Sequence, residues 1–254
     1  MNDCIGFFDS GVGGLSVMHA ARRLLPRENF FYYGDSGNAP YGPRPVDEIR
    51  ALCEAGFRRI LDHGVKAIVI ACNTATAAYM DELAAQVDVP VIGTEPALRE
   101  AQAARRDGEI LAMATRATLN SRAFQRLLAQ YGDHVIPLAG EGLVELVESG
   151  NARGPEAESA LRGLLGPYQA RRIDGIVLGC THYPFLSDAL RALFPEAEFF
   201  DGGIQTSRKL CAALDARGLR SASATGTTEY ATSGGGETLK LMHRLMASLD
   251  ASNC

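Results

Sequence analysis

The chain has 254 residues, of which 46% are apolar and 22% charged, with a net charge of −5. This length suits one large domain or two of ordinary size, with a sizeable core. The acidic balance and the lack of a basic block argue against a nucleic-acid or anionic membrane partner. No apolar run is long enough to cross a membrane and the first residues do not resemble a secretory signal, so we expect a cytoplasmic protein.

The cysteines form no CxxC pair and no cluster with metal-ligand spacing, so we predict no metal site. A disulfide scaffold is not expected in a chain of this size without an export signal. We therefore expect reduced thiols, and interpret four of them as structural. The six cysteines are Cys4, Cys53, Cys72, Cys180, Cys211 and Cys254.

Short β-branched or aromatic runs alternate with longer amphipathic stretches along the chain. They predict strands at residues 4–8, 29–34, 66–71, 89–92, 109–114, 134–138, 175–179 and 198–201. Helical periodicity predicts helices at 15–25, 46–63, 120–131 and 143–148, with a solvated helix within 151–172 and a mobile loop at 220–227. This alternation predicts an α/β fold of mostly parallel sheets flanked by helices.

Two stretches share one layout, in which a buried strand ends in a small residue, a cysteine and then polar residues that open a helix. They are residues 67–74 around Cys72 and 175–182 around Cys180. Open α/β sheets bind ligands at the carboxyl ends of their strands. We therefore predict two similar lobes, each placing one thiol in a shared cleft. The first would comprise residues 1–94 and 207–254, and the second residues 95–206.

The loop at residues 9–14 (DSGVGG) follows a strand and precedes a helix, where glycines allow close backbone approach and free N–H groups attract an anion. It matches neither the dinucleotide fingerprint nor a P-loop. Asp9 and Ser10 could equally form a turn or cap the helix. The next loop, with Asp35 and the stiff Pro-Tyr-Gly-Pro turn around Tyr41, permits the same structural interpretation.

Cys72 could be a small buried apolar side chain, as most cysteines at strand ends are. It also begins a predicted helix, and a helix N-terminus lowers the pKa of a thiol from its ordinary value of about 8.5. Asn73 and Thr74 would offer donors to a carboxylate. Two cysteines in matched settings favour a function for both.

Cys180 is followed by His182, which can exchange a proton with a thiol or stabilise a thiolate. A core histidine bonded to backbone is the alternative. Glu148 could be a surface carboxylate or a group that orients His182. Hydroxyls at Thr115, Thr118 and Ser121 follow the strand at 109–114 in the second predicted lobe.

Two thiols that face each other across a cleft suit inversion at an acidic carbon. One thiolate removes a proton from one face, and the other thiol donates a proton to the opposite face. An amino-acid α-proton is very weakly acidic, so donors around the α-carboxylate must stabilise the carbanionic character.

Several motifs together resemble the glutamate racemase family over nearly the whole chain. They are DSGVGG (9–14), GDS (34–36), PYG (40–42), ACNTAT (71–76), ATRAT (114–118) and LGCTHYP (178–184). The resemblance implies cofactor-independent interconversion of L- and D-glutamate, which supplies D-glutamate for peptidoglycan. It implies that Cys72 acts on D-glutamate with help from Asp9, and Cys180 on L-glutamate with help from His182, near Glu148. It implies that the substrate is held by Ser10, Tyr41, Gly42, Asn73, Thr74, Thr118, Thr181 and His182, with Asp9 beside them.

Three segments depart from the usual pattern of that family. The run before Glu148 (PLAGEGLVELVE) lacks an expected Cys-Pro pair, Asp201 is followed by GGIQTS, and the tail carries SGGGE at 233–237. None of these departures touches the two thiols.

Other functions remain open at this point. A related enzyme could act on aspartate, hydantoins or maleate, because only the length of the side-chain pocket needs to differ. A ligand-binding protein would need neither thiol, and a cysteine hydrolase built on Cys180 and His182 would not need Cys72. We expect glutamate as the small-molecule partner and a homodimer.

Overall fold

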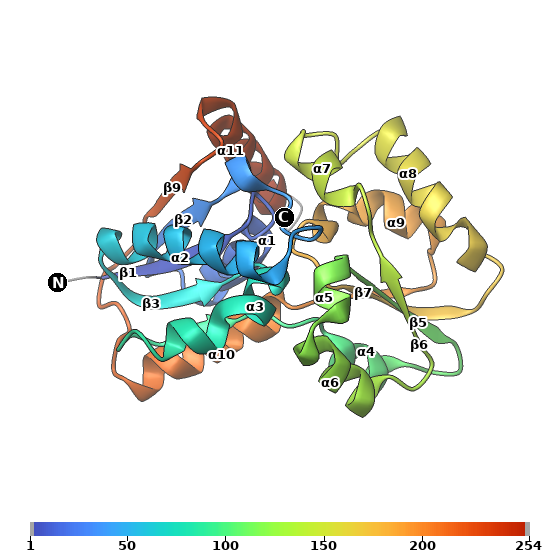
Figure 1. The fold of residues 1–254 in the computed structure, drawn as a ribbon, viewed down its shortest axis with the longest axis horizontal. Helices are drawn as coiled ribbons and strands as arrows, with labels where there is room; N and C mark the ends of the chain where they lie inside the picture. The colour runs from blue at the N-terminus through green and yellow to red at the C-terminus, as the bar shows by residue number, and fades with distance from the viewer. Residues whose placement is uncertain (1–2, 252–254) are drawn as a thin grey trace.

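The computed structural model describes residues 3–251, which form two α/β lobes side by side (Figure 1). All strand pairs formed by these residues are parallel. The first sheet has the order β4 (Val91–Gly93), β3 (Val65–Ile70), β1 (Cys4–Asp9), β2 (Asn29–Gly34) and β9 (Thr228–Thr232). The second has the order β6 (Val135–Ala139), β5 (Glu109–Ala114), β7 (Ile173–Leu178) and β8 (Glu198–Asp201).

The two sheets repeat one topology. Read from one edge, the first runs β4-β3-β1-β2 and the second runs β8-β7-β5-β6, so each of the first four strands has a counterpart four strands later. Even the register shift recurs, between Cys4 and Ile5 in β1 and between Glu109 and Ile110 in β5. The predicted α/β class with two similar lobes is confirmed, and β9 is an addition to the first lobe.

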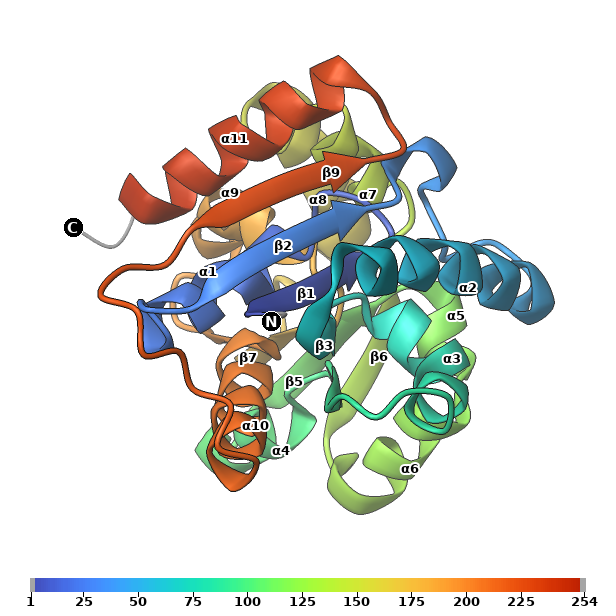
Figure 2. The same cartoon turned by 90° about the vertical axis from the view of Figure 1, so that its left-hand side faces the viewer.

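Helices cover both faces of both sheets, as parallel sheets require. On the first sheet, α1 (Leu15–Leu24), α10 (Gly203–Ala216) and α11 (Gly236–Ala251) lie on one face, and α2 (Val46–His63) and α3 (Asn73–Ala84) on the other (Figure 2). On the second, α4 (Leu98–Ala104), α5 (Arg116–Asn120) and α6 (Arg122–Tyr131) lie opposite α7 (Leu143–Glu148), α8 (Pro155–Leu165) and α9 (Ser187–Leu193) (Figure 1). Short 3₁₀ turns are η1 (Ser36–Asn38), η2 (Gly166–Tyr168) and η3 (Tyr183–Leu186).

Alternating side chains of the strands feed separate cores. Phe7 and Phe8 of β1 are both fully buried, but Phe7 packs on the α1 side and Phe8 on the α2 side. The core on the α1 side continues into the second lobe, where it includes Leu143 and Val147 of α7. The lobes thus share apolar packing as well as polar contacts.

The eight predicted strands all form, most within two residues of the predicted ends. β9 was missed because its sequence, TEYAT, is half-exposed at a sheet edge and has no apolar run. Residues 220–227 contain no helix or strand, and their backbone is hydrogen-bonded to Glu28 and Asn29. The limits of the two lobes and the mobility of this loop stay predictions.

The helix predicted within residues 151–172 is α8, and it is not solvated all round. Ala157, Leu161 and Leu165 are buried against the second lobe, because they recur at helical spacing on one face. Among the described residues, no helix is long and apolar enough to span a bilayer. Cys254 lies outside the described residues.

Two helical glycines differ in their surroundings and predict opposite effects of alanine. A Cβ atom added to Gly56 in α2 would lie 2.2 Å from Phe8 Cε2, whereas one added to Gly163 in α8 would meet nothing within 4 Å. We expect Gly56→Ala to destabilise the protein by about 1–3 kcal/mol through overpacking. We expect Gly163→Ala to stabilise it by about 0.5–1 kcal/mol through helix propensity. Urea unfolding measures both, and equal effects in the two variants would contradict the packing of α2 on β1.

Candidate active site

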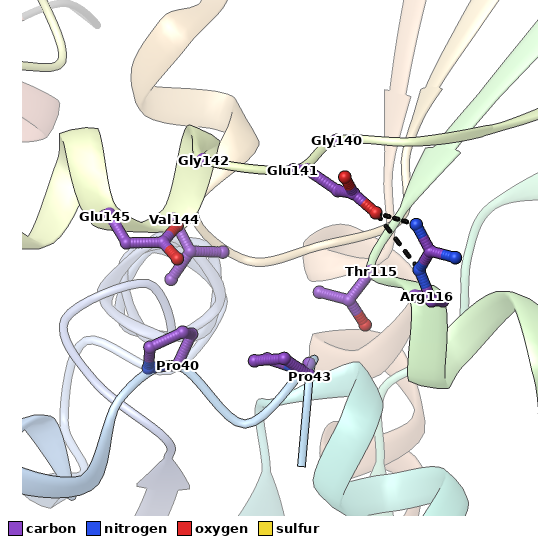
Figure 3. Close-up of a pocket in the computed structure, with 10 residues that line it drawn as sticks. Pro40, Pro43, Thr115, Arg116, Gly140, Glu141, Gly142, Val144 and Glu145 are labelled. Atoms are coloured by element: carbon purple, nitrogen blue, oxygen red, sulfur yellow. Dashed lines mark hydrogen bonds and ion pairs between the residues drawn. The ribbon is translucent and has the colours of Figure 1, made fainter.

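A narrow cavity with about 10 Å³ of free space lies where the carboxyl ends of the two sheets meet. It is lined by Ser10, Pro40, Tyr41, Gly42, Cys72, Asn73, Thr74, Thr115, Val144, Gly179, Cys180, Thr181 and His182. A wider depression of about 440 Å³ adjoins it and shares Pro40, Gly42, Thr115 and Val144 with it. Figure 3 shows Pro40, Thr115 and Val144 on the wall of this depression. Both lobes line the cavity, so a bound ligand would contact both of them.

Cys72 enters the cavity from the first lobe at the N-cap of α3. Its Sγ accepts a hydrogen bond from the Ala75 backbone N–H at 3.4 Å, and its thiol donates to Ser10 Oγ at 3.4 Å. The side chain is 5% exposed. The predicted helix start is confirmed.

The predicted lowering of the Cys72 pKa is wrong for the protein without substrate. Burial and the nearby charge of Asp9 raise the pKa of Cys72 to about 12. The hydrogen bonds that Cys72 shares with Ser10 Oγ and with the Ala75 N–H lower this pKa, but by less. Cys72 is therefore a protonated thiol at neutral pH, and an approaching cation would favour its ionised form.

Cys180 enters the cavity from the second lobe, directly after β7, and is 7% exposed. It does not cap an α-helix. Pro184 has no N–H to bond the Cys180 carbonyl, so the Tyr183 N–H bonds it at 3.0 Å in a tighter 3₁₀ turn. The matched helix start predicted for the two cysteines therefore holds for Cys72 only.

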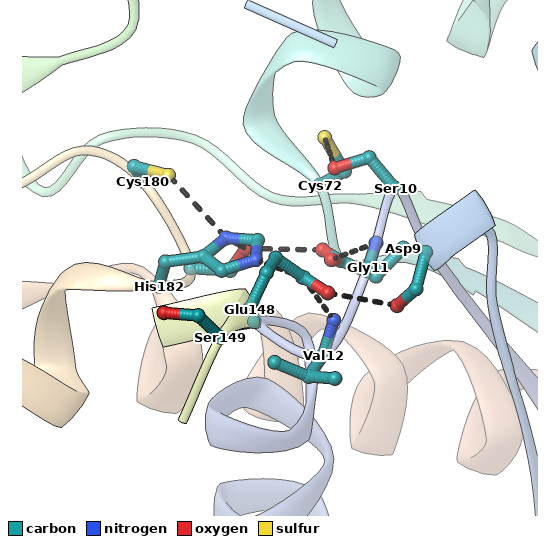
Figure 4. A network of polar contacts seen from close by, with 12 residues as sticks. Asp9, Ser10, Gly11, Val12, Cys72, Glu148, Ser149, Cys180 and His182 are labelled. Carbon is teal, nitrogen blue, oxygen red and sulfur yellow. Dashed lines mark hydrogen bonds and ion pairs between the residues drawn. The ribbon is translucent and has the colours of Figure 1, made fainter. Parts of the chain in front are cut away.

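His182 replaces the helix as the support of Cys180 (Figure 4). Its Nδ1 lies 3.7 Å from Cys180 Sγ, and its Nε2 lies 2.6 Å from Glu148 Oε1. Burial by itself lowers the pKa of His182, but the bonds to Cys180 and Glu148 outweigh it and hold this pKa well above its usual value. The imidazolium can stabilise a thiolate on Cys180.

Glu148 comes from α7 of the second lobe but is held by the first. Val12 N donates to Glu148 Oε1 at 2.7 Å (Figure 4), and Ser36 Oγ donates to Oε2 at 2.9 Å. Burial by itself raises the pKa of Glu148, but the bond and charge of His182 hold it below its usual value. The carboxylate orients His182, which was one of the two interpretations that the sequence left open.

Asp9 lies behind Ser10 at the end of β1 and is fully buried. Its Oδ1 accepts from Gly11 N at 2.9 Å, and its Oδ2 accepts from Thr181 Oγ1 at 3.0 Å. Burial raises the pKa of Asp9, and the charge of His182 opposes that rise. The carboxyl group is therefore able to hold a proton at higher pH than an exposed aspartate.

The glycines of the 9–14 loop allow the second lobe to approach. A Cβ atom added to Gly11 would lie 1.8 Å from Glu148 Oε1, and one added to Gly13 would lie 2.3 Å from His182 Nδ1. The glycines were predicted to let the backbone approach a ligand; in the structure the loop lies close to these two side chains of the second lobe.

Hydroxyl groups join the lobes on the other side of the cavity. Thr74 Oγ1 of α3 lies 2.9 Å from Thr115 Oγ1 and 3.1 Å from Thr118 Oγ1. Asn73 is 6% exposed, and its Oδ1 is buried without a hydrogen-bond partner. An unpaired buried acceptor beside a cavity suits a ligand that brings a donor.

Most of the predicted site residues are brought together. Thr118 lies behind Thr74, while Ser121 caps α6 by accepting from Phe124 N at 3.1 Å and does not line the cavity. Sequence reasoning missed Val144 and the role of Ser36, whose only signal was its place in the GDS motif. In residues 3–251 no group of three His, Cys, Asp or Glu side chains could hold a metal ion.

The sequence model of the Asp/Glu/hydantoin racemase family matches residues 16–205 of this chain. A glutamate racemase from Clostridium perfringens is 46% identical over 224 residues, which are 87% of this chain and 86% of that protein. The crystal structure of glutamate racemase from Thermus thermophilus in complex with β-chloro-D-alanine matches with a TM-score of 0.80 at 40% identity, over 96% of this chain and 93% of that one. The Escherichia coli glutamate racemase in complex with L-glutamate and an activator matches with a TM-score of 0.85 at 26% identity, over 98% and 96%.

The Glu148–His182 pair predicts a shifted titration of one histidine. We expect the His182 ring to stay protonated through neutral pH, because a raised pKa means that the proton is lost only at higher pH. In Glu148→Gln the ring should lose its proton at a lower pH, because burial lowers the pKa of His182 and the Glu148 charge that raises it is gone. Nuclear magnetic resonance of ¹⁵N-labelled histidine rings across pH measures this. Glu158→Gln, an exposed carboxylate on α8, is the control, and an unchanged His182 titration in Glu148→Gln would contradict the assignment.

Proposed function

The chain belongs to the Asp/Glu/hydantoin racemase family, and we propose that it interconverts L- and D-glutamate without a cofactor, with Cys72 and Cys180 as the two acid–base groups. The relatives named above are glutamate racemases, and one was solved with L-glutamate bound. The proposal for this chain depends most on the placement of its two thiols.

Cys72 and Cys180 follow equivalent strands of the repeated unit, β3 and β7, and both line one cavity. Thiols that enter from opposite lobes can reach opposite faces of one carbon. A hydrolase would need one of these thiols and a binding protein neither. The pairing therefore favours inversion of a stereocentre over both alternatives.

The proton balance of the reaction is simple. From L-glutamate, the Cys180 thiolate takes the α-proton and the Cys72 thiol gives its proton to the opposite face. D-glutamate results, with Cys180 protonated and Cys72 ionised, and the reverse reaction uses the opposite roles. His182 stabilises the Cys180 thiolate, and Asp9, close enough to raise the pKa of Cys72, can exchange a proton on that side.

The substrate would be held without a basic side chain, since no Lys or Arg is among the residues that line the cavity. Its carboxylates would accept from hydroxyl and N–H donors, and its ammonium group would donate to Asn73 Oδ1. The ammonium also lowers the cost of a thiolate on Cys72. The substrate-holding groups are Ser10, Tyr41, Gly42, Asn73, Thr74, Thr118, Thr181 and His182, with Asp9 beside them.

We propose further that the product D-glutamate supplies peptidoglycan synthesis in the cytoplasm, and that the protein acts as a homodimer. These roles follow from the activity and the family, and each is separate from the chemistry of the cavity. Aspartate, hydantoins and maleate are the competing substrates. Measuring turnover of each of these compounds beside glutamate identifies the substrate.

Racemisation in D₂O tests the reaction directly. We expect L-glutamate to yield D-glutamate with deuterium at Cα, because the proton delivered to the second face comes from a thiol that exchanges with solvent. Chiral chromatography with mass spectrometry measures both signals. A folded, reduced sample that produces neither would overturn the proposal.

Replacing each thiol separately tests the two-base mechanism. We expect Cys72→Ser and Cys180→Ser each to lower racemisation by about 10²–10⁴-fold, because each removes one of the two acid–base groups. Cys211→Ser on α10 is the matched control, since that free thiol is remote from the cavity lining. Full racemisation in Cys72→Ser together with loss in Cys180→Ser would favour a one-thiol mechanism instead.

A further inference from the structure

The hydroxyl group of Ser233, in the tail segment SGGGE, contacts the loop that follows β2, beside the candidate active site. Ser233 directly follows β9, and its Oγ donates to Asp35 Oδ1 at 2.6 Å and accepts from Gly37 N at 2.9 Å. Ser233 N also donates to Gly34 O at 3.3 Å. One residue near the end of the chain thus contacts three positions in the loop that follows β2.

The fit between these two segments is close. A Cβ atom added to Gly37 would lie 2.9 Å from the Ser233 carbonyl oxygen, and one added to Gly234 would lie 3.0 Å from Ser36 Cβ. The 34–38 loop therefore has little room to move while the turn after β9 is in place.

The 34–38 loop makes two contacts with the site. Ser36 Oγ donates to Glu148 Oε2, and Asp35 Oδ2 accepts from Tyr41 OH at 2.7 Å. Glu148 orients His182, and Tyr41 lines the cavity. Asp35 is 4% exposed, so the position of its carboxylate depends on the donors around it.

We propose that Ser233 is a positioning residue for the site. It holds the 34–38 loop so that Ser36 keeps Glu148 aimed at His182 and Asp35 keeps Tyr41 against the cavity. This role rests on the proposed racemisation for its kinetic effect, but the orientation of His182 does not depend on the substrate. The hydrogen bonds of Ser233 go to the 34–38 loop and to Tyr33 of β2, and neither thiol is among its partners.

Ser233 itself is exposed, which makes the hydroxyl easy to remove. Ser233→Ala leaves no cavity in the core, so we expect a folded protein. We expect kcat/KM for glutamate to fall by about three- to tenfold, the size of one hydrogen bond of ordinary strength. Ser233→Thr retains the hydroxyl and should restore most of that loss.

A double-mutant cycle with Ser36→Ala tests the path of the effect. Because Ser233 reaches His182 through Ser36 and Glu148, the double variant should shift the His182 signal little more than Ser36→Ala alone. The ¹⁵N signal of the His182 ring should move in both single variants. Thr238→Val is the control, since Thr238 Oγ1 bonds Gly234 O in the same turn and contacts no loop residue through that hydroxyl.

The two proposals fail in different ways. Absence of glutamate racemisation in the unmodified protein would overturn the proposed function, while a shifted His182 signal in Ser233→Ala would still support the positioning role. An active protein in which Ser233→Ala keeps kcat/KM within about twofold and leaves the His182 signal unmoved would overturn the positioning role. So would shifts of the His182 signal in Ser233→Ala and Ser36→Ala that simply add in the double variant.

Discussion

The hydrogen-bonded carboxylate of Glu148, whose side chain is 15% exposed, is the group on which the site depends. One oxygen pairs with His182 and accepts from Val12 N, and the other accepts from Ser36. A buried charge is stable only when it is paired and hydrogen-bonded, and these partners come from both lobes. Forming this contact therefore brings the glycine loop, the loop after β2 and the Cys180 strand together at the cavity.

The repeated fold places the two thiols at equivalent positions, but the groups around each thiol differ. β3 and β7 occupy equivalent places in the two sheets, so Cys72 and Cys180 meet at one cavity. Cys72 is supported by a helix N-terminus and hydroxyl and carboxyl groups, whereas Cys180 is supported by His182. Burial raises the pKa of Cys72, whereas the His182 ring lies 3.7 Å from Cys180 Sγ, so the two thiols differ in their electrostatic surroundings.

Local patterns predicted the strands and the chemistry near them. Apolar runs such as the one that ends at Cys72 identify central parallel strands, because such strands are covered on both faces. The same reasoning missed β9, which is stabilised by its pairing with β2 rather than by its own composition. The local pattern also predicted a lowered pKa for Cys72, whereas burial raises it. Burial depends on the packing of both lobes and not on the helix that follows Cys72.

The sequence by itself determined the α/β class and the repeated strand–cysteine unit, because each depends on residues close together along the chain. Most of the other side chains that line the cavity were identified only through motifs that resemble those of glutamate racemases. Only the tertiary structure decided that Glu148 bonds Val12 and Ser36, that the glycines of the 9–14 loop admit His182, and that Ser233 contacts Asp35. These contacts join positions more than 100 residues apart, where no local spacing or periodicity specifies the partner. The distance between them is closed by the packing of two lobes, so the hydrogen-bond network appears only when the sheets are assembled.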